Sequence, residues 1–174
     1  MPTTFHLRVW TRFLASAEDV WALKTDPSAI GAEFGPLASF RFTDPAAVSR
    51  ALAGEAPVDV PARFGPVGMP LIAWPARIEA VEPGKSFRDT STNALFSRWE
   101  HDHLVEATPD GCRYIDAITF VSTTPTQKLT AIVTQRLFQH RHAVAARRLP
   151  TDPQATGVAV LRVLVEQDWD SART

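Results

Sequence analysis

FSRWEHDHLVEATPDGCRYIDAITFV, residues 96–121, has the pattern of two β-strands joined by a tight turn. In both halves apolar and polar side chains alternate, which is the period of a strand with one face buried. The segment Thr108-Pro109-Asp110-Gly111 between the halves is typical of a hairpin turn. We therefore predict antiparallel strands at Phe96–Glu106 and Arg113–Val121.

The two faces of this predicted hairpin differ in chemistry. The charged residues Arg98, Glu100, Asp102 and Glu106 share one face of the first strand. Because these side chains must reach water, we expect the opposite face to point inward. The inward face carries Trp99, His101, His103 and Val105 on the first strand, and Tyr114, Asp116, Ile118 and Phe120 on the second. A tight turn would place His103 opposite Asp116.

Further strands are predicted by the same alternation or by β-branched and aromatic residues between turn signals. They are Thr3–Leu14, Ser39–Phe42, Leu71–Val81 and Ser86–Ser91. On the last of these, Phe87 and Asp89 share a face. Prolines at 57, 61, 66 and 70 predict an irregular stretch before Leu71. A loop of this length is either a lid at a site or a tolerated insertion.

Helices are predicted from caps and from apolar spacing. Ser16 and Asp26 are candidate N-caps of two short helices, and Asp44-Pro45 with Gly54 brackets an extra helix at about 45–53. A long helix spans about 124–149, with an apolar stripe that includes Leu129, Val133 and Leu137. We expect its outer face to be basic, with Lys128, Arg136, Arg141, Arg147 and Arg148.

This element order predicts an α+β fold in which a curved antiparallel sheet wraps around the long C-terminal helix. Such a curved sheet leaves a cavity against the helix. The length of 174 residues fits one domain with a sizeable core. We place the core at about 3–149 and a C-terminal extension at 150–174, in which Gly157–Trp169 has the composition of a strand.

Composition and motifs exclude several classes of partner and cofactor. Lys plus Arg number 18 and Asp plus Glu number 19, so the net charge is −1 and nucleic acid is not an expected partner. The single Cys112 fits a reducing compartment. No segment predicts a membrane span or a signal peptide, so we expect a cytoplasmic protein. No P-loop, nucleotide-binding glycine motif, nucleophile elbow or zinc-protease motif occurs, and we expect no cofactor.

The inward faces predict a polar cluster within an aromatic surface. Asp89, His101, His103, Tyr114 and Asp116 share this surface with Trp74, Trp99 and Phe120. A buried carboxylate needs a partner, and a structural Asp–His pair is one interpretation. The pair also suits the polar end of an apolar ligand, or acid–base chemistry by His103 and Asp116. His-x-His spacing alone is weak support for a metal site, and we predict none.

Several of these segments, in this order, resemble the SRPBCC superfamily of START-like helix-grip proteins, in particular its bacterial branch of mostly uncharacterised members. They are Ala17-Glu18-Asp19-Val20-Trp21, Asp26-Pro27, Trp74, Glu82-Pro83-Gly84-Lys85, Phe87-x-Asp89, Trp99-x-His101-x-His103, Asp116 and Leu137-Phe138-x-x-Arg141. The resemblance covers about residues 3–149. It implies a helix-grip fold with a deep pocket for lipids, polyketides or other hydrophobic molecules. The extra helix and the extension depart from the usual pattern.

Our leading hypothesis is therefore a protein that binds a hydrophobic small molecule in an internal cavity. The expected wall comprises Trp74, Asp89, Trp99, His101, His103, Tyr114, Asp116, Phe120, Leu129, Val133 and Leu137. Two alternatives stay open: a cyclase- or dehydratase-type enzyme that uses His103 and Asp116, and a regulatory or interaction protein with a filled core. The sequence also leaves open a homodimer.

Overall fold

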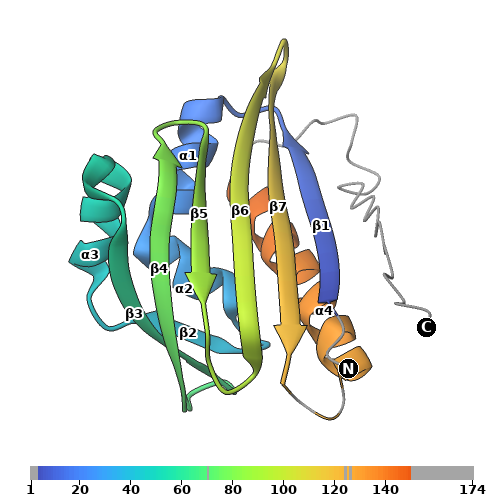
Figure 1. Ribbon diagram of the computed structural model, residues 1–174. Helices are drawn as coiled ribbons and strands as arrows, with labels where there is room; N and C mark the ends of the chain where they lie inside the picture. The colour runs from blue at the N-terminus through green and yellow to red at the C-terminus, as the bar shows by residue number, and fades with distance from the viewer. Residues whose placement is uncertain (1–3, 70, 124, 126, 150–174) are drawn as a thin grey trace, which may run out of the picture.

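The computed structural model describes residues 4–69, 71–123, 125 and 127–149. Its strands form one antiparallel sheet in the order β1-β7-β6-β5-β4-β3-β2. Figure 1 shows α1, α2 and α4 behind this sheet, on the same face. The strands are β1 (Thr4–Phe13), β2 (Ser39–Phe42), β3 (Val58–Gly65), β4 (Ile72–Glu82), β5 (Ser86–Ser91), β6 (Phe96–Thr108) and β7 (Gly111–Ser122). The helices are α1 (Ala17–Thr25), α2 (Pro27–Phe34), α3 (Pro45–Arg50) and α4 (Gln127–Ala146), with a short π-helical turn, η1 (Ala51–Glu55).

The central hairpin of β6 and β7 confirms the predicted register. His103 lies opposite Asp116, and the ladder runs back to Thr108 opposite Gly111. The inward side chains of β6, from Trp99 to Val105, are at most 6% exposed. On β7 the inward residues Tyr114, Asp116, Ile118 and Phe120 are at most 2% exposed. The alternation therefore identified the inner face of both strands.

The predicted irregular stretch after Pro57 is wrong for residues 58–65, which form β3. Pro61 pairs with Pro75 of β4. Since neither proline has an N–H, two prolines can face each other only where the ladder makes no hydrogen bond, and no bond is lost there. The Pro61 carbonyl instead accepts a hydrogen bond from the backbone N–H of Thr43. Val60 and Ala62 face inward in the normal alternation.

The short helices begin where their caps predict. The Ser16 hydroxyl accepts a hydrogen bond from the Asp19 N–H, and the Asp26 carboxylate accepts one from the Ser28 N–H. Asp44 caps α3 in the same way. Gly54 takes a φ of 104° within η1, a conformation that disfavours other residues. Together α3 and η1 cover residues 45–55, where the extra helix at about 45–53 was expected.

Helix α4 presents a different face to the sheet from the one that we predicted. Leu129 and Val133 are 58% and 56% exposed. The buried face instead carries Thr134, Phe138, Arg141, His142 and Ala145. The expectation that Leu129 packs inward is therefore wrong, as is the placement of Arg141 on an outer basic face. Arg141 has its partner in Glu33 of α2, and His142 has its partners in Asp116 of β7 and Thr11 of β1. Hydrophobic spacing cannot indicate such polar partners.

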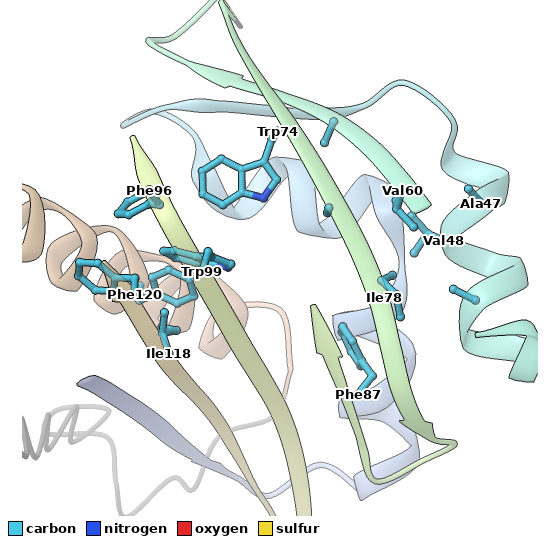
Figure 2. Close-up of a cluster of buried hydrophobic side chains, with 14 of the residues drawn as sticks. Ala47, Val48, Val60, Trp74, Ile78, Phe87, Phe96, Trp99, Ile118 and Phe120 are labelled. Carbon is cyan, nitrogen blue, oxygen red and sulfur yellow. The ribbon is translucent and has the colours of Figure 1, made fainter. Parts of the chain in front are cut away.

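The largest core cluster is aromatic at one end and aliphatic at the other. Figure 2 shows Trp74, Phe96, Trp99 and Phe120 close together, with Ile78, Val60 and Val48 at a distance from them. The Trp74 and Trp99 rings stand edge to face with centroids 5.2 Å apart. This aromatic group forms the floor of the site described below.

Two features of the chain complete the description. Within the described residues, no helix combines the length and the hydrophobicity that crossing a bilayer requires. The C-terminal extension at 150–174, with the strand expected at Gly157–Trp169, lies outside the described residues.

Candidate functional site

A pocket of about 140 Å³ lies between the concave face of the sheet and α4. Most of its wall is aromatic or aliphatic, including Phe34, Phe40, Phe64, Trp74, Phe96, Trp99 and Phe138. Val48 of α3 and Leu52 of η1 also line it, so the extra helix contributes to the site. Val133 is both exposed and part of the wall, which marks the place where the pocket reaches the surface.

Charged and imidazole groups occupy one corner of this pocket. Asp89 of β5 and His101 and His103 of β6 are part of the wall, together with Arg141 of α4. Asp89 lies opposite His101 in the β5–β6 register, which brings the side chains together on the inner face. Its Oδ2 lies 3.0 Å from Nδ1 of His101 and 2.9 Å from Nε2 of His103. Its Oδ1 accepts a hydrogen bond from the Trp99 indole at 3.1 Å.

Asp116 is the second carboxylate of the cluster and lies behind the pocket wall, completely buried. Oδ1 of Asp116 lies 3.0 Å from Nε2 of His101 and accepts a hydrogen bond of 2.5 Å from the Tyr114 hydroxyl. Oδ2 lies 3.1 Å from Nε2 of His142 on α4. The Tyr114 oxygen lies 2.7 Å from Nδ1 of His103. Asp116 thus connects both strands to the helix.

The two adjacent histidines differ in their pKa values. Burial disfavours the charged form of His101, but Asp89 and Asp116 outweigh this effect and raise its pKa to about 9. Burial and the charge of His101 lower the pKa of His103 to about 4. Burial alone would raise the pKa of both carboxyl groups, yet His101 lowers the pKa of Asp89 and of Asp116 below the usual range. Near pH 7 the cluster therefore holds an imidazolium at His101 and a neutral ring at His103.

A buried ion cluster adjoins this network. Glu33 of α2 is completely buried and accepts a hydrogen bond of 2.8 Å from Lys24 of α1. Its other oxygen lies 3.3 Å from Nε of Arg141. The Arg141 guanidinium also lies over the rings of Phe34 and Phe138, at 4.8 Å from each centroid. These contacts compensate for the burial of three charged groups and fix α1, α2 and α4 to each other.

The structure brings most of the predicted site residues together, but not all of them in one wall. The pocket is lined by Trp74, Asp89, Trp99, His101, His103, Val133 and Leu137. Tyr114 and Asp116 lie behind His101 and His103, as their partners. Phe120 packs beneath Trp99, and Leu129 is absent from the wall. In the predicted pair, Nδ1 of His103 lies 3.4 Å from Oδ1 of Asp116. Tyr114 and Asp89 are nearer partners of His103.

Several functional neighbours were missed by sequence analysis. His142 and Arg141 belong to a helix whose buried face was misassigned, and Glu33 and Lys24 lie on short helices with weak patterns. A signal for the first pair existed, since Phe138, Arg141, His142 and Ala145 follow the spacing i, i+3, i+4, i+7 of one helical stripe. No comparable signal links Glu33 to Arg141, because 108 positions separate them.

Comparisons with known proteins agree with this architecture. The model of the domain of unknown function DUF8410 matches residues 11–149. No curated protein matches the sequence significantly.

Solved structures show the same fold at low sequence identity. The ZhuI aromatase/cyclase from Streptomyces sp. R1128 is 12% identical, with a TM-score of 0.65 over 83% of this chain and 93% of that one. Protein CV1439 from Chromobacterium violaceum is 13% identical, with a TM-score of 0.61 over 80% and 96%. The di-domain ARO/CYC BexL from the BE-7585A biosynthetic pathway is 17% identical, with a TM-score of 0.60 over 86% and 51%. The α+β helix-grip fold predicted from the sequence is confirmed.

Proposed function

The chain belongs to the DUF8410 family of domains of unknown function, and we propose that it binds a small hydrophobic molecule in the pocket between the sheet and α4. The observation that carries this proposal is the composition of the wall, which is aromatic and aliphatic except for one corner. Ligand sites commonly combine a largely apolar surface with a few polar groups that orient the ligand. Here Asp89, His101 and His103 are the orienting groups.

The size and shape of the pocket support a compact ligand. Its volume of about 140 Å³ is close to the ~150 Å³ of a protein cavity that accepts benzene. Trp74 and Trp99 offer aromatic edges and faces to a planar guest. We therefore propose an aromatic-like molecule of one or two rings, with a hydroxyl or carbonyl group directed toward the Asp89 corner, rather than a long acyl chain.

A fluorescence titration tests this proposal. Naphthol is added to the purified protein while tryptophan emission is followed, because two tryptophans line the pocket. Ala76 lies in the wall, so Ala76→Leu fills part of the pocket and should weaken binding by ~10-fold or more, about 1.4 kcal/mol. Ala73→Leu is the matched control, since Ala73 lies on the exposed face of the same strand. Equal affinity for both variants, or no binding by the wild type, would count against the pocket.

Mass spectrometry of the small molecules extracted from the protein supplies an independent test. A protein purified without denaturation should release a small hydrophobic molecule on organic extraction. Ala76→Leu should release less of it than Ala73→Leu, because the filled pocket has lost volume. Repeated absence of any such molecule, together with no naphthol binding, would reject the proposal.

A second candidate is a cyclase- or dehydratase-type enzyme that acts in the same pocket. The position of His103 in the pocket wall supports it, because an imidazole that reaches a bound molecule can exchange a proton with it. Likeness of fold to two aromatase/cyclases is the other support. His103→Gln separates the candidates: a binding protein should keep most of its ligand affinity, whereas an enzyme should lose ~10²-fold or more of its activity.

The resemblance to the SRPBCC superfamily belongs to this proposal as well. The shared helix-grip fold supports it at identities too low to indicate a common substrate. A homodimer stays a prediction from the sequence.

A further inference from the structure

Three ligand-type atoms converge at the polar corner of the pocket. Oδ2 of Asp89 lies 3.0 Å from Nδ1 of His101 and 2.9 Å from Nε2 of His103. One ligand atom from each of these residues lies within 4.8 Å of the other two. All three residues line the pocket, so this point is accessible to a solute that enters it.

When His101 and His103 are both neutral, these two rings and Tyr114 have fewer hydrogens than their polar contacts with each other, Asp89 and Asp116 require. The hydrogen of His101 is then needed at Nε2 for Asp116, and that of His103 at Nδ1 for the Tyr114 oxygen. The Tyr114 hydroxyl donates its own hydrogen to Asp116. No hydrogen remains for the contacts of either ring with Asp89, which would place nitrogen lone pairs against a carboxylate oxygen.

Protonation of His101 satisfies only one of these contacts. The second hydrogen of the His101 imidazolium can point to Asp89 from Nδ1. The one hydrogen of a neutral His103 ring cannot serve both Tyr114 and Asp89, so a hydrogen at Nδ1 leaves Nε2 facing Oδ2 of Asp89 at 2.9 Å with none between them. A cation at the point where the three atoms meet would satisfy both rings at once.

We propose that Asp89, His101 and His103 form a binding site for a divalent transition-metal ion, held by Oδ2, Nδ1 and Nε2 respectively. Bond lengths of ~2.1 Å place neighbouring ligand atoms roughly 3.0 Å apart at octahedral angles and roughly 3.4 Å apart at tetrahedral angles. The separations of 3.0 and 2.9 Å from Asp89 are close to the octahedral value. Metal binding does not depend on the proposed organic ligand, because it can be measured without one.

The surroundings of the two histidines match those of metal ligands in proteins. A coordinating histidine usually donates its other ring hydrogen to a carboxylate or another acceptor, which fixes the tautomer. His101 has Asp116 in this position, and His103 has Tyr114. Asp89 is held in turn by the Trp99 indole. Two imidazoles and one carboxylate favour Zn²⁺, Fe²⁺ or Co²⁺ over Mg²⁺ and Ca²⁺, which prefer oxygen ligands only.

Titration of the chelator-treated protein with ZnCl₂, followed by calorimetry, tests the proposal. We expect one ion per chain to bind at micromolar concentration or below. Asp89→Asn and His103→Gln should each weaken binding by ~10-fold or more. Asp102→Asn and His6→Gln are matched controls, because these residues lie on the outer side of the sheet and are not part of the cluster. The controls should bind like the wild type.

A measurement on the unaltered protein covers the case in which a buried variant fails to fold. Paramagnetic Co²⁺ should shift and broaden the NMR signals of the His101 and His103 rings, and Zn²⁺ should reverse the effect by competition. Absence of Zn²⁺ or Co²⁺ uptake by the wild type at micromolar metal would overturn the proposal. So would unchanged affinity in folded Asp89→Asn and His103→Gln variants, or signal changes confined to His6.

Discussion

Glu33 is the carboxylate of the buried ion cluster and the partner of two cations, Lys24 and Arg141. A buried pair adds little net stability over an apolar substitute, but removal of one partner leaves a charge without compensation. Loss of the Glu33 charge should therefore strongly destabilise the protein. Its position also fixes Arg141 at the pocket wall.

Glu33→Gln should destabilise the protein by about 3–5 kcal/mol, since Lys24 and Arg141 would both lose their carboxylate. Urea unfolding followed by circular dichroism measures the change. Glu82→Gln is the control: Glu82 pairs with Lys85 on the surface, with 59% of its side chain exposed, and should change stability by less than ~1 kcal/mol. Similar losses for both variants would contradict the role of the buried cluster.

Cys112 gives a second test at this scale. The thiol is buried, and burial followed by the charge of Asp19 raises its pKa to about 11. The reactive thiolate is therefore scarce at pH 8, and we expect slow alkylation by iodoacetamide. The rate should rise as the pH approaches 11, and denaturation at pH 8 should make the reaction fast. Rapid stoichiometric labelling of the folded protein at pH 8 would show that the thiol is accessible.

Individual elements were predicted from the sequence to different degrees. Strands β6 and β7 were located with their inner faces, because alternation and a turn motif act locally. Strand β3 was missed because Pro61 within it and Pro57 and Pro66 beside it argue against a strand. The pairing of Pro61 with Pro75 shows how the strand accommodates its proline. The face of α4 was misassigned because Arg141 and His142 are buried by partners that lie far away in the sequence.

The corrected face of α4 predicts contrasting substitution effects. Phe138→Ala should cost about 3–5 kcal/mol, because Phe138 is 3% exposed and packs against Trp99 and His101. Leu129→Ala should change stability by less than ~0.5 kcal/mol, because its side chain is largely exposed. Thermal unfolding of the two variants decides the matter. A larger loss of stability for Leu129→Ala than for Phe138→Ala would instead support the buried face that hydrophobic spacing predicted.

The turn between β6 and β7 depends on Gly111. Its φ is 148°, and a Cβ there would collide with the Phe13 carbonyl oxygen of β1. Gly111→Ala should therefore cost about 1–3 kcal/mol more than Gly68→Ala. Gly68 also has a positive φ, of 77°, but nothing lies within 4 Å of its Cβ position, so it controls for backbone strain alone. Equal costs in urea unfolding would mean that the close approach of β1 is unimportant.

At the scale of the whole molecule, the sequence predicted the fold class and most of the candidate wall. Residues from β4, β5 and β6 were assigned to the pocket from the alternation of inward and outward side chains along each strand, which needs no knowledge of distant contacts. The pairing of β1 with β7 and the contact of His142 with Asp116 join residues more than 25 positions apart, for which local patterns carry no information. The contact between His142 and Asp116 lies behind the polar corner, where Asp116 is also the partner of His101.

A crystal structure of the protein soaked with naphthol tests the central claim most directly, since the claim is that the space between sheet and α4 accepts a compact hydrophobic guest. We predict density for the ring system against Trp74 and Trp99, with the hydroxyl within hydrogen-bond distance of Asp89 or His103. A solid interior at this place, or naphthol bound only elsewhere on the surface, would contradict the account.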